Sequence, residues 1–487
     1  MLFNSLNFMI FFPIVVLGYF VVPKKAKNIW LLISSYYFYM CWKPVYALLI
    51  LFSTFSTFVF AIFIDKTPKA KNKKLFLTLN ILLNIGILFY FKYFNFFITT
   101  LTGLIPGLSI STNTDLLAVV GISFYTFQSL GYSIDVYRGR VEREKNFLTY
   151  ALFVSFFPQL VAGPIERSEN LLPQFHQTYK FNYSSASNGL KLMAWGFFKK
   201  LIIADGAAQI INVVYNEPTK YSGIQLIVAT VLFAFQIYGD FSGYSDIAKG
   251  AAAVLGYKLM RNFNHPYFAT SVPDFWRRWH ISLSSWFMDY IYIPLGGSRK
   301  GTVRTCINLM ITFLLSGLWH GAAATFIIWG GINGLYNVIS RLYHDIRIKI
   351  KGEIKDNNAK INPFVQLSKV VGTFLLIDFS WIFFRAKSLS DAMYIVKNLF
   401  SDIFMAFNPA YFTQAMTKIG FYSNNGIAIV CCIIFMLLVE IYEGRGELTK
   451  KLSKCNVIIR WIFYYTIIIL ILFFGWFGQS QFIYFQF

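Results

Sequence analysis

The chain has 487 residues, of which 56% are hydrophobic, 20% aromatic and only 14% charged. Soluble domains carry about 25% charged residues, so this composition excludes an ordinary water-soluble enzyme and indicates an integral membrane protein. The formal net charge is +22, but the basic residues gather in short connectors between apolar runs. That distribution is typical of cytoplasmic loops, so we expect a lipid bilayer and no nucleic acid as the partner of this surface.

Apolar segments separated by basic connectors make up the first third of the chain. One membrane crossing needs about 20 residues, so the run from 29 to 64 is long enough for a helical hairpin. The predicted spans in this part are residues 8–22, 29–64, 76–98 and 116–137. The connectors that follow them alternate in charge, with basic residues at 24–27, 66–74 and 138–145 and none at 99–114.

The positive-inside rule orients these helices. With the basic connectors in the cytoplasm, the N-terminus and the C-terminus both lie outside the cell. Three later basic stretches then lie inside, at 299–304, 341–360 and 445–454. The stretch 341–360 carries both signs of charge and is predicted to be a solvated loop. In total we expect about ten to twelve crossings, from one crossing per roughly 20 apolar residues.

The apolar segments recur from end to end, which predicts one all-α integral membrane domain over residues 1–487. Its peripheral helices occupy 1–115 and 363–487, and the polar motifs concentrate at about 116–342. Within this core, the segment 266–294 mixes aromatic residues with aspartate, arginine and histidine. Such a segment cannot face lipid, because its charges and its proline-broken backbone would be unsatisfied. It is predicted to form re-entrant or interfacial helices beside a protein-enclosed cavity.

Two of the five histidines lie in hydrophobic surroundings, where an ionisable side chain is costly and is therefore a functional candidate. His320 follows Trp319 at the end of one apolar run, and Gly321 separates it from the next. Small residues beside it allow close helix packing or close approach of a substrate. Histidine changes protonation near neutral pH, which suits a general base. A structural histidine bonded between helices fits the same pattern.

His280 lies next to two arginines and two tryptophans, in the sequence Trp276-Arg277-Arg278-Trp279-His280, with Asp289 further along the same segment. Arginine binds phosphates through its planar guanidinium group, which points to a substrate-binding or second catalytic histidine at a cytoplasmic entrance. An interfacial helix with tryptophans at headgroup level and snorkelling arginines explains the segment equally well.

A third polar cluster, from Gln236 to Asp246, lies between apolar runs. Its polar members Asp240, Ser242 and Asp246 can line a cavity or orient a histidine. Asp, Ser and Gly also favour helix junctions, so the interpretation we adopt is that the cluster caps and joins two helices. The sequence has no P-loop, no Gly-x-Ser-x-Gly elbow and no His-Glu-x-x-His motif, so no metal site is predicted.

The sequence resembles the membrane-bound O-acyltransferase superfamily, in its bacterial branch of alginate and peptidoglycan O-acetyltransferases. The resemblance covers almost the whole chain and rests on the segments 121–139, 157–167, 199–205, 240–246, 273–299, 317–321 and 381–386. His320 falls on the invariant catalytic histidine of that superfamily. His280 falls on the second histidine of this branch.

The resemblance implies a multi-pass protein of the bacterial cell membrane, with helices around a central tunnel. It implies transfer of an acetyl group from a cytoplasmic thioester, acetyl-CoA, to an extracytoplasmic polysaccharide or peptidoglycan, without a permanently bound cofactor. A separate extracytoplasmic acetyltransferase or acyl-carrying protein is the expected partner. The expected catalytic residues are His320 and His280, and the expected substrate-binding or tunnel residues are Arg277, Arg278, Trp276, Trp279, Trp319, Asp240, Ser242, Asp246 and Asp289.

Two alternatives stay open at this point. One is a D-alanyl transfer protein for teichoic acid from the same superfamily, and the other is a polytopic polysaccharide transporter without acyl chemistry. The arginine doublet and the sequence Ile293-Pro-Leu-Gly-Gly fit the acetylation branch better. No clear internal repeat is present, which weakens the transporter interpretation.

Overall fold

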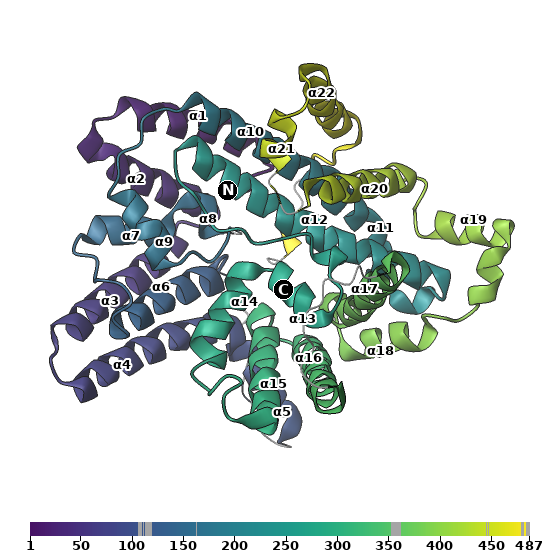
Figure 1. Cartoon of the computed structure of the whole chain (residues 1–487), viewed down its shortest axis with the longest axis horizontal. Helices are drawn as coiled ribbons and strands as arrows, with labels where there is room; N and C mark the ends of the chain where they lie inside the picture. The colour runs from purple at the N-terminus through teal and green to yellow at the C-terminus, as the bar shows by residue number, and fades with distance from the viewer. Residues whose placement is uncertain are drawn as a thin grey trace. The chain divides into compact units, whose positions relative to one another are not determined.

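The computed structural model describes residues 1–105, 110, 112, 119–161, 163–351, 362–444, 446, 448–478 and 482–483. Over these residues the secondary structure is helical throughout, with connecting turns and no strand (Figure 1). The predicted all-α class is therefore confirmed. By proximity the chain forms two compact units, one of Met1–Gly196 with Tyr244–Met260 and the other of Phe197–Gly243 with Arg261–Phe485. The expectation of a single domain stays a prediction.

The first unit is built from short and medium helices. They are α1 (Leu6–Val21), α2 (Lys27–Met40), α3 (Tyr46–Lys66), α4 (Ala70–Leu88), α5 (Phe94–Leu104), α6 (Ile122–Tyr137), α7 (Phe147–Ser155), α8 (Phe157–Leu160), α9 (Ser168–Phe175) and most of α10 (Tyr183–Phe198). The predicted hairpin at 29–64 is present as the helices α2 and α3, of which α3 is long and apolar enough to cross a membrane. Helix α5 continues to Leu104, further than the loop expected from residue 99.

Buried amides and hydroxyls join three helices of this unit. The Ser53 hydroxyl on α3 donates to Asn84 Oδ1 on α4 at 2.6 Å, and Asn84 donates in turn to Asn80 Oδ1 at 2.8 Å. Asn80 then donates to the Ser133 hydroxyl on α6 at 2.8 Å. Inside a membrane such bonds hold helices together, because lipid offers the same groups no partner.

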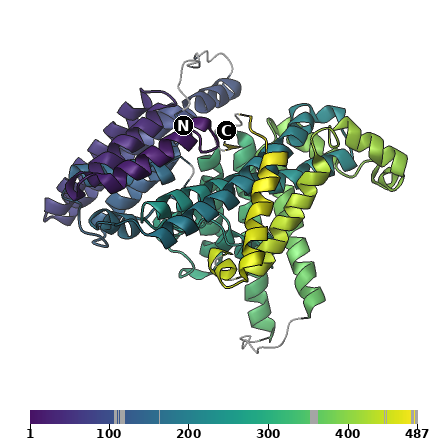
Figure 2. The same ribbon diagram turned by 90° about the horizontal axis from the view of Figure 1, so that it is seen from above.

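The second unit contains α11 (Asp205–Asn216), α12 (Ile224–Val254, whose last turns belong to the first unit), α13 (Val272–Arg278), α14 (Ile281–Phe287), α15 (Gly301–His320), α16 (Ala324–Lys351), α17 (Pro363–Arg385), α18 (Leu389–Asn398), α19 (Pro409–Lys418), α20 (Gly426–Glu443), α21 (Leu448–Ser453) and α22 (Val457–Phe474). Helices α15 and α16 pack side by side (Figures 1 and 2). Helix α13 packs on both α16 and α17.

Seven of the described helices are long and apolar enough to cross a membrane, and α1 is a shorter apolar helix. The seven are Tyr46–Lys66, Ala70–Leu104, Ile224–Val254, Gly301–His320, Pro363–Arg385, Gly426–Glu443 and Val457–Phe474. Ten to twelve crossings would have to include shorter or more polar helices, so that number stays a prediction.

Two sequence interpretations are wrong. Helix α12 runs without a break through Asp240, so the polar cluster there does not join two helices. Asp240 is mid-helix because a buried cation faces it: Lys200 Nζ lies 2.7 Å from its carboxylate. The stretch from 341, predicted to be a loop, is helical as far as Lys351. There an ion pair between Arg341 and Asp345, at 3.1 Å and i,i+4 spacing, supports the helix. Residues 352–361 lie outside the described part.

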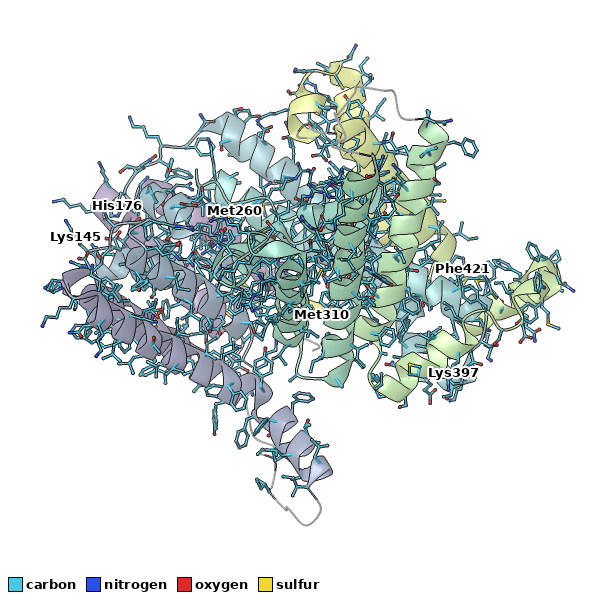
Figure 3. All side chains as sticks on the ribbon, turned by 60° about the horizontal axis from the view of Figure 1, so that its bottom comes forward. Lys145, His176, Met260, Met310, Lys397 and Phe421 are labelled. Atoms are coloured by element: carbon cyan, nitrogen blue, oxygen red, sulfur yellow. The ribbon has the colours of Figure 1, made fainter. Side chains whose placement is uncertain are left out.

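The remaining histidines lie in surface positions or loops. His176 lies on the surface of the first unit (Figure 3), with Nε2 2.7 Å from the Glu144 carboxylate. His344, near the end of α16, has a side chain that is 59% exposed. His265 is in a connecting loop but is buried, which the sequence did not indicate.

Candidate functional site

His280 and His320 line the same cavity in the second unit, which has a volume of about 500 Å³. Its walls come from α13, α14, the turn of π-helix at Met288–Tyr292, α15 and α16. Three further predicted residues also line it, namely Trp276, Arg277 and Asp289. Most of the remaining wall is apolar, as is usual for a ligand site with a few placed polar groups.

His320 is the last residue of α15, and glycines determine its position. Gly321 follows in an extended conformation and ends the helix. One turn before the histidine, Gly317 has no room for a side chain, because a Cβ atom there would overlap the carbonyl oxygen of Phe326 on α16. The absence of a side chain lets α15 and α16 approach closely, which places His320 against the neighbouring helix.

Aromatic rings surround the imidazole of His320. Ring centroids lie 4.9 Å away for Trp319, 5.0 Å for Trp329 and 5.3 Å for Phe384 on α17. The exposed fraction of His320 is 4%. This packing limits the ring to a narrow range of orientations, which a positioned acid or base requires.

His280 lies in the turn between α13 and α14 and has a left-handed backbone, with φ 44° and ψ 54°. A residue other than glycine adopts this conformation at a cost, so the surrounding structure must hold it. Two backbone hydrogen bonds do so: Ile281 N–H donates to Asn262 O, and Asn264 N–H donates to Arg278 O, both at 2.9 Å. Strained residues cluster at functional sites, which supports a role for this turn.

Helix α13 is well defined despite its seven residues. Ser271 caps it by accepting a hydrogen bond from Asp274 N–H, and Arg277 and Arg278 lie in its last turn, where positive charge favours the helix dipole. The segment therefore presents its two arginines and His280 within four residues of chain.

The two imidazoles are close to each other, with ring centroids 6.5 Å apart. Both rings can therefore contact one small molecule in the cavity. Phe241 on α12 packs edge-on against His280 at 4.5 Å between centroids. Burial in these surroundings lowers the pKa of His280 to about 3, so its imidazole is neutral at physiological pH.

Comparison with known proteins identifies the kind of chain that carries this site. Residues 141–351 match the membrane-bound O-acyltransferase family. The peptidoglycan O-acetyltransferase of Helicobacter pylori is 36% identical over 434 residues, covering 82% of this chain and 80% of that protein. The chain belongs to the membrane-bound O-acyltransferase family.

Other relatives differ in the acyl group that their names give. The probable alginate O-acetylase AlgI of Pseudomonas aeruginosa is 38% identical over 406 residues, covering 82% of this chain and 75% of that protein. The teichoic acid D-alanyltransferase of Bacillus subtilis is 27% identical over 289 residues, covering 56% of this chain and 70% of that protein. The chain is an acyl-transfer enzyme, and its similarity to the acetyl-transferring relatives is the higher and longer one.

Several residues predicted from the sequence lie outside the cavity wall of this O-acyltransferase. Trp279 is buried beside Trp381 at 5.2 Å between centroids, and Trp319 packs against both histidines. These tryptophans therefore support the histidines. Ser242 is buried in α12, and Asp246 belongs to the other compact unit.

Asp240 is part of a buried ion cluster. Lys200 Nζ lies 2.7 Å from Asp240 Oδ1 and 2.8 Å from Asp205 Oδ1, and the exposed fraction of all three side chains is 4% or less. The C-terminal segment closes the cluster, because Ile483 N–H donates to Asp240 Oδ2 at 2.7 Å. Phe482 beside it packs on Phe241, the ring that contacts His280.

A second pocket of about 370 Å³ adjoins the arginine doublet and shares Arg277 with the histidine cavity. Its polar wall includes Arg278, which pairs with Asp274 at 3.0 Å, and His265, which lies 3.5 Å from Glu440. The sequence analysis did not single out Glu440. An acidic residue inside the apolar run of α20 was the signal that would have found it.

Proposed function

We propose that this O-acyltransferase transfers an acetyl group from acetyl-CoA in the cytoplasm to hydroxyl groups of a polysaccharide or peptidoglycan outside the bacterial cell membrane. The observation that carries the proposal is the pair of buried histidines, 6.5 Å apart between centroids, in one largely apolar cavity. The names of the two most similar relatives reported above support acetyl as the acyl group.

His320 is the proposed general base. Its imidazole takes the proton of an acceptor hydroxyl, the oxygen attacks the thioester carbonyl carbon, and the carbon–sulfur bond breaks. The proton then passes from the imidazolium to the leaving thiolate, which departs as a thiol. The neutral imidazole of His280 has one N–H, which can stabilise the negative charge on the carbonyl oxygen.

The donor is proposed to enter beside Arg277 and Arg278, whose guanidinium groups suit its phosphates. Support comes from the second pocket, which includes both arginines and Gly444 at the end of α20. The chain continues from there into the basic residues 445–454, which the positive-inside rule assigns to the cytoplasm. The N- and C-termini then lie outside. An extracytoplasmic acetyltransferase or acyl-carrying protein is the proposed partner for the outward step.

The test uses the purified full-length protein in detergent with acetyl-labelled acetyl-CoA. We expect acetyl release from the thioester, and a loss of about 10²- to 10⁴-fold in His320→Ala, the range typical of a general base. His280→Ala should also lose much of the activity. The exposed His344→Ala is the matched control and should retain wild-type activity.

Two results would contradict the proposal. Normal polymer acetylation in cells that express His320→Ala at the wild-type level would exclude His320 as the base. Transport of a polysaccharide without any acetyl release would favour the transporter alternative. Unchanged donor affinity in Arg277→Ala and Arg278→Ala would exclude only the proposed phosphate contacts and leave the rest of the proposal standing.

A further inference from the structure

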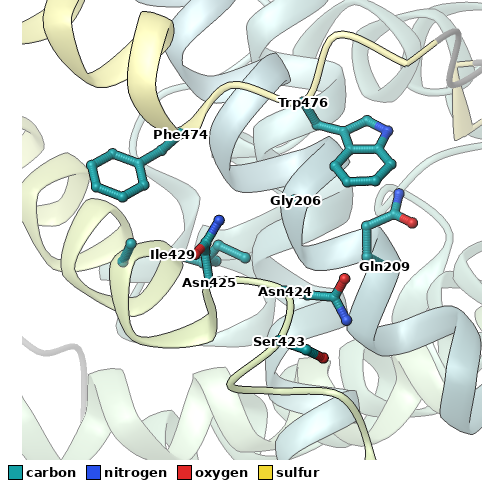
Figure 4. Close-up of a pocket in the computed structure, with 9 residues that line it drawn as sticks. Gly206, Gln209, Ser423, Asn424, Asn425, Ile429, Phe474 and Trp476 are labelled. Atoms are coloured by element: carbon teal, nitrogen blue, oxygen red, sulfur yellow. The ribbon is translucent and has the colours of Figure 1, made fainter.

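A small depression of about 70 Å³ lies in the second unit, apart from the histidine cavity, with which it shares no lining residue. It is formed by the first turns of α11, the turn that precedes α20 and the end of α22 (Figure 4). The side chains that define it are Gln209, Ser423, Asn424, Asn425, Phe474 and Trp476.

The lining combines polar side chains with apolar ones and carries no charge among the described residues. Three carboxamides each carry both hydrogen-bond donors and acceptors, whereas the Ser423 hydroxyl donates to Gly420 O and is left with acceptor capacity. Trp476 and Phe474 add aromatic rings that are 43% and 39% exposed. Figure 4 shows Gln209 directed toward the indole of Trp476, with Asn424 facing the same space. Neutral amides around an exposed indole suit a neutral carbohydrate, whose hydroxyls need paired donors and acceptors and whose ring has an apolar C–H face.

The backbone around the depression is held in place. Gly420 and Asn425 both adopt positive φ, at 72° and 56°. Gly426 N–H donates to Phe421 O at 2.8 Å, and the amide of Asn424 donates to Gly420 O, also at 2.8 Å. On the opposite wall, Trp476 N–H donates to Leu201 O at 2.9 Å. The side chains therefore project from a pre-formed turn, which lowers the entropy cost of binding.

The depression lies at the ends of α20 and α22 opposite to those joined by the basic stretch 445–454. It is lined by residues 423–425 just before α20, by Phe474 at the end of α22 and by Trp476 just beyond it, whereas that stretch connects the other ends of the same two helices. Both helices are candidate membrane spans. In the orientation that the positive-inside rule predicts, the depression faces the outside of the cell.

We propose that this depression binds a neutral, N-acetylated sugar residue of the acceptor polymer, with the sugar ring against Trp476 and its acetamido group among the amides. The inference rests on the proposed function for the presence of an extracytoplasmic glycan. An anionic uronate residue is the disfavoured alternative, since its carboxylate would need a basic partner, and no Lys or Arg is among the described lining residues. The depression, at about 70 Å³, is too small for several sugar residues.

The experiment measures binding of two trisaccharides to the purified full-length protein in detergent, by saturation-transfer NMR and calorimetry. One is the β-1,4-linked trimer of N-acetylglucosamine, and the other is trimannuronate. We expect saturable binding of the N-acetylated trimer, weakened by at least about tenfold in Trp476→Ala, as for a central aromatic contact. Trp476→Phe should bind close to wild type. Trp461→Ala, at an exposed tryptophan on helix α22, is the matched control and should leave binding unchanged.

The inference is overturned if trimannuronate binds as well as the N-acetylated trimer, if neither binds, or if Trp476→Ala binds like wild type. Retained binding in Trp476→Phe shows that a loss in Trp476→Ala does not come from misfolding. The variant His320→Ala distinguishes this inference from the proposed function, because it removes the proposed base and changes no residue of the depression. Trisaccharide binding without acetyl release in the wild type would refute the proposed function and leave the sugar site standing. Acetyl release that depends on His320, without binding that depends on Trp476, would refute the sugar site alone.

Discussion

Gly317→Ala tests whether close packing of α15 on α16 positions His320. A Cβ atom at residue 317 would lie well inside 3.0 Å of the Phe326 carbonyl oxygen and 3.2 Å from Gly330 Cα. Both are backbone atoms, so no flexible side chain can move aside, and the helices must separate by roughly 1 Å. A displacement of that size at a catalytic group costs about 10²-fold in rate. We therefore expect acetyl release to fall about 10²-fold although both histidines are intact.

Gly331→Ala is the matched control, because residue 331 lies on α16 near the same crossing. A Cβ atom there would meet only Leu314 Cδ2, at 3.7 Å, which is ordinary contact. This variant should keep wild-type activity, and its helix should gain up to about 1 kcal/mol from the loss of a glycine. The assay is acetyl release by purified protein, with thermal unfolding in detergent to confirm folding. If Gly317→Ala were as active as Gly331→Ala, helix packing would not position His320.

Three further predictions concern stability, measured by unfolding in detergent. Burial raises the pKa of Glu166 from 4.5 to about 7, so the folded state favours the protonated carboxyl. The free energy of unfolding should be highest below pH 4.5 and fall by about 3 kcal/mol between pH 4.5 and 7, at about 1.4 kcal/mol per pH unit. Glu166→Gln should lose this pH dependence. An unchanged pH profile in the variant would contradict the assignment to Glu166. Lys200→Met leaves the Asp205 and Asp240 carboxylates buried without their cation, so it should lower the free energy of unfolding by about 3–5 kcal/mol. Adding Asp205→Asn and Asp240→Asn should recover part of this loss. Without such recovery, the loss would not come from the unpaired carboxylates. Asn84→Ala removes the amide that links α3 to α4 and should cost about 1–2 kcal/mol, whereas stability equal to wild type would show that the link is dispensable.

The helical class follows from the sequence because a lipid environment leaves few solutions. Apolar runs of sufficient length must form helices, so α2 and α3 fall where the hydropathy places them, whereas α4 begins at Ala70, inside the predicted connector 66–74. The costly position of two histidines in apolar surroundings likewise identified the candidate site before any coordinates. The resemblance to O-acyltransferases then assigned roles to these residues, and the comparisons bear out the family.

Local composition misled where a distant partner decides the structure. Asp, Ser and Gly in the cluster around Asp240 favour a helix junction, yet α12 is continuous there. The reason is Lys200, 40 positions earlier in the chain, whose ammonium group lies 2.7 Å from Asp240. The amides of the depression beside Trp476 have no sequence signature, because they come from segments that only the fold brings together.

The sequence by itself determined that this is a helical membrane protein with two chemically distinctive histidines, since burial cost and segment length are local properties. Only the tertiary structure decided that His280 and His320 line one cavity with centroids 6.5 Å apart. The two histidines are 40 residues apart in the chain. A left-handed turn at His280 and the glycine contact between α15 and α16 bring them together. Both depend on neighbours far away in the sequence, so their geometry follows from packing and not from local preference.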